Sequence, residues 1–126
     1  MQKLLLALLI LSALAACNEN NNPDEGQNFV FNDSSATSGR LIVETLDQSG
    51  NRLDNTVVYL FLAYEDIERN LYIFFRESDN NGKADFGYIN IGSYYITSIK
   101  ANLGLSDTAV VQVRSQQIEN KRVVLN

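Results

Sequence analysis

The one cysteine of the chain, Cys17, is the residue best placed for a chemical modification. It follows a short apolar run from Leu4 to Leu14, with the positive charge of Lys3 before the run and two alanines after it. The run is shorter than the roughly 20 apolar residues that a membrane-spanning helix needs. A charged start, a short apolar middle and small residues before a cut are the three parts of a secretory signal. We therefore expect a signal peptide whose cleavage would expose Cys17.

The segment Leu14-Ala15-Ala16-Cys17 resembles the lipobox of bacterial lipoproteins. The resemblance implies that residues 1–16 are a lipoprotein signal peptide. It also implies a diacylglycerol thioether on Cys17 and acylation of the new N-terminus. The alternative is an ordinary signal peptide with a cysteine there by chance. A single cysteine can form no disulfide within the chain, and lipidation would remove a thiol exposed outside the cell. We expect the acyl chains on Cys17 to hold the protein to a membrane.

Composition excludes several classes of site. The chain has no histidine, so Ser-His-Asp catalysis and imidazole metal sites are ruled out. Ten Lys and Arg stand against fifteen Asp and Glu, a formal net charge of −5, which makes nucleic acid a poor partner. We therefore expect no catalytic residues, no metal, no cofactor and no nucleic-acid partner, and we expect that the protein is not an enzyme.

Two acidic clusters have plainer interpretations than a metal or catalytic site. The segment Asp79-Asn80-Asn81-Gly82-Lys83-Ala84-Asp85 carries oxygen ligands of the kind that Ca²⁺ prefers, but its spacing fails the EF-hand rule. Asn-Gly is also a strong hairpin signal, so a turn accounts for the segment. Glu65, Asp66 and Glu68 have no partner base, and a solvated loop accounts for them.

The residues from Gly39 onward predict an all-β fold. Short runs rich in Val, Ile, Tyr, Phe and Thr alternate with turn signals every eight to twelve residues or so, which is typical of a sandwich or barrel. The one proline, Pro23, interrupts none of these runs. The charged segment 64–70 predicts one helical turn or a loop. The seven strands that we expect cover residues 41–46, 56–63, 71–75, 83–88, 94–100, 108–113 and 121–125.

Residues 17–38 predict a disordered polar tether behind the lipidated cysteine. Asn18 to Asn28 is polar and acidic, and such a stretch cannot bury enough apolar surface to offset its chain entropy. The apolar triplet Phe29-Val30-Phe31 interrupts it. This triplet is either an edge strand or peg docked on the folded domain, which we favour, or a patch for a partner.

Several motifs after residue 38 occur in a familiar order, and they are Gly39-x-Leu41-x-Val43, Asp47-x-x-Gly50-x-x-Leu53, Gly82-x-Ala84-x-Phe86, Ile91-Gly92-x-Tyr94-x-Ile96 and Val123-x-Leu125. In these motifs residues 39–126 resemble prealbumin-like, or transthyretin-like, domains of the carboxypeptidase regulatory-like and collagen-adhesin B-type families. The resemblance implies an Ig-like, seven-stranded Greek-key β-sandwich without enzymatic activity. Some adhesin relatives carry a Lys–Asn isopeptide bond, but the first strand here, Arg40 to Leu46, has no lysine.

The strand expected at 56–63 contains the candidate binding residues. If Val58, Leu60 and Leu62 face inward, alternation turns Tyr59 and Phe61 outward. An outward row of Tyr59 and Phe61 is a possible aromatic binding face for a sugar or a protein. The tether could equally cover it, because strands that are apolar on both sides usually lie mid-sheet.

The same alternation places Tyr94 in the core beside Phe86 and Leu60, with Tyr95 on the opposite face. Such a side chain would be among the largest contributors to the core.

Two functions fit these features. The first is a lipid-anchored, non-enzymatic module that serves as a structural or protein-interaction subunit. The alternative is a carbohydrate-binding accessory lipoprotein that uses exposed aromatic side chains. A coplanar exposed patch would favour the alternative, and burial of the aromatics would favour the first.

The residue after the cysteine bears on the location of the protein. Asn18 after Cys17 resembles lipoproteins sorted to the outer membrane. We therefore expect the protein in the bacterial cell envelope, on the periplasmic or surface face, with an envelope protein or glycan as its partner.

Overall fold

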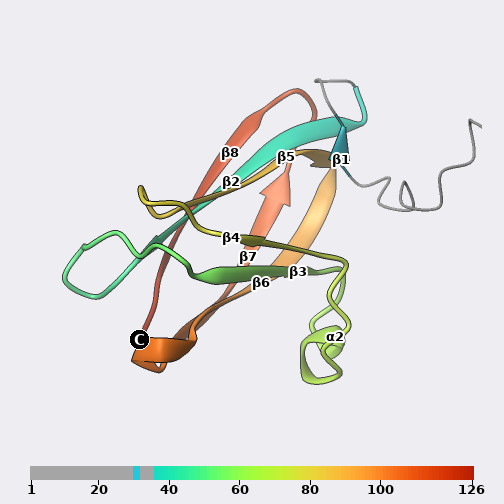
Figure 1. Ribbon diagram of the computed structural model, residues 1–126. Coiled ribbons are helices and arrows are strands. Elements are labelled where there is room, and N and C mark those ends of the chain that lie inside the picture. Colours follow the sequence, from blue (N-terminus) through green and yellow to red (C-terminus); the bar gives the residue numbers. More distant parts are fainter. Residues whose placement is uncertain (1–29, 32–35) are drawn as a thin grey trace, which may run out of the picture.

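Two four-stranded β-sheets pack face to face in the computed structural model, which describes residues 30–31 and 36–126 (Figure 1). One sheet, the β2 sheet, has the order β1 (Val30–Phe31), β5 (Lys83–Asn90), β2 (Ser38–Leu46) and β8 (Ile118–Val124). The other, the β6 sheet, has the order β4 (Phe74–Glu77), β3 (Val57–Phe61), β6 (Gly92–Lys100) and β7 (Leu105–Val113). Neighbours are antiparallel except β2 and β8, which are parallel. The expected all-β sandwich is confirmed.

The apolar triplet before the domain contributes an edge strand. Val30 and Phe31 pair antiparallel with Ile89 and Tyr88 of β5, so β1 adds to the seven strands β2 to β8. Cys17, the signal peptide and the rest of the expected tether lie outside the described residues. Within residues 30–31 and 36–126, no helix has the length and apolar character to cross a bilayer.

The core lies between the sheets and is formed by inward-facing side chains that alternate along each strand. Leu41 and Val43 of β2, with Ala84 and Phe86 of β5, are at most 1% exposed. Tyr94 of β6 is 3% exposed, belongs to the same core cluster, and its hydroxyl donates to the carbonyl oxygen of Asn90 at 2.6 Å. The predicted register of this strand is therefore correct. The wider cluster also includes Leu53, Val58, Leu60, Phe74, Ile89, Ile96, Val111, Val113, Val123 and Leu125.

A buried cluster of hydroxyl groups joins two of the four places where the chain crosses between sheets, the β2–β3 and β4–β5 connections. The carbonyl oxygen of Leu53, on the way from β2 to β3, accepts hydrogen bonds from Thr45 Oγ1 and Ser78 Oγ, both at 2.7 Å. Ser78 Oγ also accepts from the Thr56 amide at 2.9 Å. The same Thr45 hydroxyl lies 3.1 Å from the carbonyl oxygen of Gly82, on the way from β4 to β5, so its one proton is shared between the two carbonyls. Since these side chains are at most 3% exposed, the contacts replace water that the groups cannot reach.

The turn from β4 to β5 is the tight turn that Asn-Gly predicts. The Gly82 amide donates to the carbonyl oxygen of Asp79 at 2.9 Å, and the Asp79 carboxylate accepts from the amides of Asn81 and Lys83. Gly82 has φ of +73°, and a Cβ there would lie 2.9 Å from the Thr45 carbonyl oxygen. A side chain at this position would therefore strain the turn and disturb the hydroxyl cluster.

The segment between β3 and β4 differs from the expectation. The strand expected at 71–75 is β4 at Phe74–Glu77, and Leu71 is 55% exposed before it. Leu62, expected in the core, is also 55% exposed because β3 ends at Phe61. The intervening chain forms one helical turn, α2 (Glu65–Glu68), which was one of the two expected forms. The short helix η2 (Ala101–Leu103) connects β6 to β7.

Residues 36–38 should stabilise the domain, although the sequence placed its start at Gly39. Backbone oxygens of Ala36, Thr37 and Ser38 accept from Ser115 Oγ, the Ile91 amide and the Gln116 amide, at 2.8, 3.1 and 2.8 Å. We expect the fragment 36–126 to exceed 39–126 in free energy of unfolding by about 3 kcal/mol, since the shorter fragment lacks all three hydrogen bonds and each contributes about 1 kcal/mol net. Urea titrations followed by circular dichroism, with and without a chelator, measure this. Equal stabilities would show that the domain starts at Gly39, and a chelator effect would show dependence on a metal.

Tyr94 and its neighbour form a matched pair for testing the core. Tyr94→Ala should cost about 3–5 kcal/mol, as truncations of buried aromatics do, and nearly unfold a domain of this size. Tyr94→Phe removes only the bond to Asn90 and should cost about 1 kcal/mol. Tyr95→Ala, on the half-buried opposite face, should cost clearly less than Tyr94→Ala. Urea titrations rank the three variants, and a larger loss for Tyr95→Ala would contradict the register of β6.

Candidate functional site

The outer face of the β6 sheet is built from side chains that line up across its four strands. One row contains Phe75 of β4, Tyr59 of β3, Thr97 of β6 and Thr108 of β7. The row towards α2 contains Phe61, Tyr95 and Val110, and the row on the other side contains Glu77, Val57, Ile99 and Ser106. Glu77 is thus the one charged side chain in the three rows.

Aromatic side chains cluster at the β4 end of this face. The ring of Tyr59 lies 5.0 Å from that of Tyr72 and 6.0 Å from that of Phe75, measured between ring centroids. Tyr72 and Phe75 are 41% and 51% exposed, while Tyr59 is half-buried between them. The interplanar angles are 54° for Tyr59–Tyr72, 38° for Tyr59–Phe75 and 88° for Tyr72–Phe75. The three rings therefore form an angled apolar cluster, not a flat platform.

Phe61 does not belong to an exposed row, which corrects the expectation for this residue. It is 2% exposed, whereas Val110 in the same row is 52% exposed. After Phe61 the chain leaves the sheet, and the ring of Tyr64 packs edge-on against Tyr95, the β6 partner of Phe61, at 5.8 Å. The segment that follows β3 thus turns back over this end of the face. Of the two residues expected in the site, only Tyr59 contributes to the accessible cluster.

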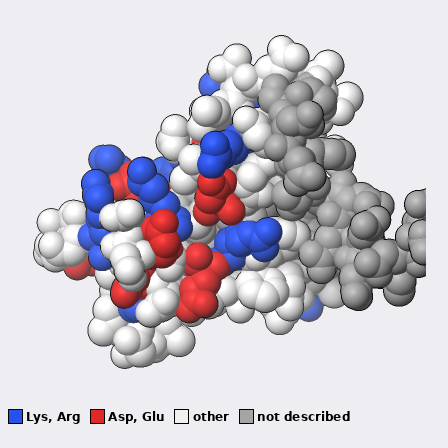
Figure 2. All heavy atoms as spheres, turned by 45° about the horizontal axis from the view of Figure 1, so that its top comes forward, with Lys and Arg blue, Asp and Glu red and all other residues white. Residues whose placement is uncertain are grey.

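The outer face of the β2 sheet has the opposite character. Its rows include Lys83, Glu44 and Arg122, and Glu44 lies within 3.9 Å of the Arg52 and Arg122 guanidinium groups. Figure 2 shows Lys and Arg intermixed with Asp and Glu over this side of the molecule. Such a face interacts favourably with water, and an apolar partner gains little from covering it.

One ion pair on the charged face shifts the pKa of an acid. Arg40 donates through Nη2 and Nε to the two carboxylate oxygens of Asp85. This hydrogen bonding holds the pKa of the Asp85 carboxyl below its ordinary value. Asp85 also accepts a hydrogen bond from the Gly87 amide at 2.8 Å.

The free edge of β4 is covered by its own arginine. The guanidinium of Arg76 lies over the ring of Phe74, 4.2 Å from the centroid, and its Nη1 donates to the carbonyl oxygen of Phe75 at 3.2 Å. By alternation along the strand, that carbonyl faces away from β3. Arg76 thus occupies one of the backbone acceptors that this edge would offer to another strand.

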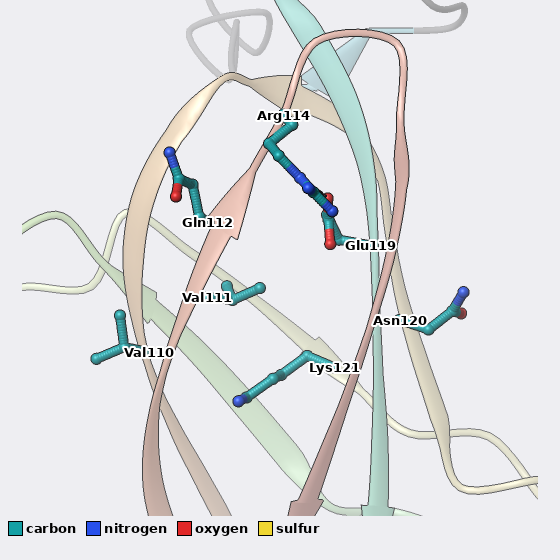
Figure 3. A pocket seen from close by; sticks show the side chains of 7 residues that line it. All are labelled: Val110, Val111, Gln112, Arg114, Glu119, Asn120 and Lys121. Carbon is teal, nitrogen blue, oxygen red and sulfur yellow. Dashed lines mark hydrogen bonds and ion pairs between the residues drawn. The ribbon is translucent and has the colours of Figure 1, made fainter.

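A second hollow lies between the edge strands β7 and β8 (Figure 3). At one end Ser106 and Asn126 exchange backbone hydrogen bonds of 3.1 Å, and at the other the turn after Val113 connects the strands. Between these ends the strands do not pair, and they leave a slit of about 290 Å³. In Figure 3 Val111 and Lys121 point into the slit, and Arg114 and Glu119 meet across its upper end. No residue pattern in the sequence indicates this site, because the slit depends on two strands that do not pair.

The buried amine of Lys100 is a structural group. Its Nζ donates to the carbonyl oxygen of Asp54 at 2.6 Å and lies 3.3 Å from the Asp54 carboxylate. Glu65, Asp66 and Glu68 lie together on α2, as the sequence suggested for a solvated segment.

Two solved structures share the fold. No family model matches the chain, and no curated protein matches it. The Bacillus anthracis TIE protein is 17% identical with a TM-score of 0.56, over 71% of this chain and 16% of that protein. A Pseudomonas aeruginosa protein proposed to bind carbohydrate is 18% identical with a TM-score of 0.51, over 83% of this chain and 97% of that one. The chain thus spans a small part of the first and nearly all of the second, and at these identities the likeness is one of fold.

Proposed function

We propose that this protein is a non-enzymatic binding module of the bacterial cell envelope, anchored by lipid on Cys17, whose recognition surface is the outer face of the β6 sheet. The single observation that carries the binding role is the exposed cluster of Tyr59, Tyr72 and Phe75 on a face with one charge in three rows. Apolar surface of this kind, opposite a charged face, is typical of an interaction site.

An envelope protein is the partner that the geometry favours. Ring planes inclined by 38° to 88° present edges as well as faces, which suits interlocking with apolar side chains. The patch continues from the aromatic cluster to Val110 and Ile99, which are 52% and 37% exposed. Aromatic side chains surrounded by smaller apolar and hydroxyl groups are common at the centre of protein interfaces.

Carbohydrate is the second candidate. Phe75 and Tyr59 share their row with Thr108, whose side chain is exposed, so a hydroxyl that can donate or accept lies on the same face as the rings. The P. aeruginosa protein of similar fold is itself proposed to bind carbohydrate, which supports this candidate by fold alone. Because the rings are inclined to one another, they offer no flat surface on which a long glycan could stack, and a short glycan fits them better.

The membrane anchor is tested at Cys17. Cys17→Ala should move the protein from the membrane fraction to the soluble fraction, because the acyl chains are the expected source of attachment. Fractionation of cells and mass spectrometry of the N-terminal peptide measure the effect. Unchanged membrane association, together with an unlipidated N-terminus in the wild-type protein, would refute the anchor.

The recognition face is tested with a pair of matched surface variants. Phe75→Ser should weaken partner binding by about 2 kcal/mol, close to thirty-fold, as loss of an aromatic anchor does. Ile118→Ser is the control, since Ile118 is 55% exposed on the opposite, charged face. The assay is quantitative cross-linking to envelope proteins in the native membrane, followed by affinity measurement with the purified partner.

A parallel binding assay with envelope glycans separates the two candidates. If glycans bind and Phe75→Ser abolishes that binding while protein cross-links persist, the protein partner is refuted in favour of carbohydrate. If Ile118→Ser is the more damaging change in both assays, the recognition face is wrongly placed.

A further inference from the structure

We propose that the slit between β7 and β8 is a second binding site, which takes a single sugar ring bearing a carboxylate. This site is separate from the aromatic cluster, which lies at the β4 end of the β6 sheet, whereas the slit opens along its β7 edge. Its volume of about 290 Å³ lies just below the usual range for ligand pockets, roughly 300–1,000 Å³, which suits a ligand no larger than one ring.

Backbone groups on both sides of the slit are available to a ligand. Ser106 uses its amide and carbonyl on Asn126, so the backbone of Ser106 faces away from β6. Alternation along β7 then directs the backbone groups of Val110 and Gln112 the same way, towards the slit. The Leu125 amide donates to Leu46 in β2, so by the same rule Asn120 presents its backbone to the slit from the other side. Amides and carbonyls in alternation can both donate to and accept from the hydroxyl groups of a sugar.

The cations of the slit specify an acidic ligand. Arg114 bonds Glu119 through Nε alone, at 2.7 Å, so both Nη atoms keep their N–H groups for a ligand. Lys121 points into the slit, and within the described residues its side-chain amine has no hydrogen bond or ion pair (Figure 3). Two cations and one anion leave a single net positive charge, which one carboxylate would neutralise.

An apolar contact completes the site. Val111 points into the slit towards Lys121, and although it belongs to the core it keeps 7% of its surface exposed there (Figure 3). This small apolar contact at the floor of the slit is available to the C–H groups of a sugar ring, whereas a bare anion such as acetate or phosphate would leave it unused. A uronate, free or as one unit of an acidic polysaccharide, fits these features. Backbone groups of the slit would bind its hydroxyls, the apolar contact would meet its ring, and the net positive charge would bind its carboxylate.

Titration of the full chain with matched small ligands tests the proposal. Amide spectra recorded by NMR should show sodium galacturonate perturbing Val111, Glu119 and Lys121, with a dissociation constant of about the millimolar range. Galactose, which lacks the carboxylate, and acetate, which lacks the ring, should each bind at least about ten-fold more weakly. A short oligogalacturonate shows whether the source is the free sugar or the polymer. Equal binding of galactose or of acetate, or no perturbation at the slit by any uronate, would overturn the proposal.

Charge variants provide the second part of the test. Lys121→Gln should weaken galacturonate binding at least about ten-fold, while Lys83→Gln, an exposed lysine of the β2 sheet, should leave it unchanged. Glu119→Gln should strengthen binding about three-fold, because it raises the net charge of the slit and keeps an acceptor for Arg114 Nε. Two other variants test the proposal if Lys121→Gln does not fold. Lys121→Arg keeps the positive charge and should retain binding, and Glu119→Gln should strengthen it. If Glu119→Gln loses binding, Arg114 and Lys121 are not the cations that bind the carboxylate, and the proposal is refuted.

Discussion

The carbonyl oxygen of Leu53 accepts hydrogen bonds from Thr45 and Ser78, and this buried contact holds together two of the four chain crossings between the sheets, from β2 to β3 and from β4 to β5. Thr45 belongs to β2, while Ser78 follows β4, so the contact joins one sheet to the other at the end opposite β1. Leaving such a carbonyl unpaired in the interior costs about 1–3 kcal/mol, so the crossings must form together to satisfy it. The rows of the β6 sheet depend on this arrangement, because the crossings set where β3 and β4 begin and end. The position of Gly82 follows from the same constraint, since only a residue without a side chain leaves space for the Thr45 carbonyl.

Sequence patterns predicted most strands well where one face of the strand is polar. Ala84 and Phe86 alternate with charged neighbours, so the β5 register followed directly from the sequence. The strand before it was misplaced, because the run 71–75 is apolar throughout and gives no alternation to read. Leu71 and Tyr72 resemble core residues by type, yet they lie on the surface because the chain is still returning from α2. Whether Phe61 is covered depends on the segment that follows it, which a strand pattern does not include.

The candidate sites arise from relations between strands and were predictable only in part. Tyr59 was identified from alternation within its own strand, but its neighbours Tyr72 and Phe75 come from beyond a helical turn. Their proximity is a product of cross-strand register, which a single sequence does not specify. The slit is even less predictable from the sequence than the aromatic cluster. It exists because β7 and β8 meet at Ser106 and Asn126 and at their connecting turn, but do not pair between those points. No residue type signals such a gap.

The arginine that covers the edge of β4 has a consequence for how copies of the protein behave together. An uncovered edge strand is a template on which another chain can add a strand, and repeated addition produces fibres. Arg76 occupies the Phe75 carbonyl and places a positive charge beside an otherwise apolar edge, so a second molecule would meet both a missing acceptor and a like charge. The exposed aromatic cluster lies next to this edge, so Arg76 also opposes strand addition at the most apolar part of the sheet.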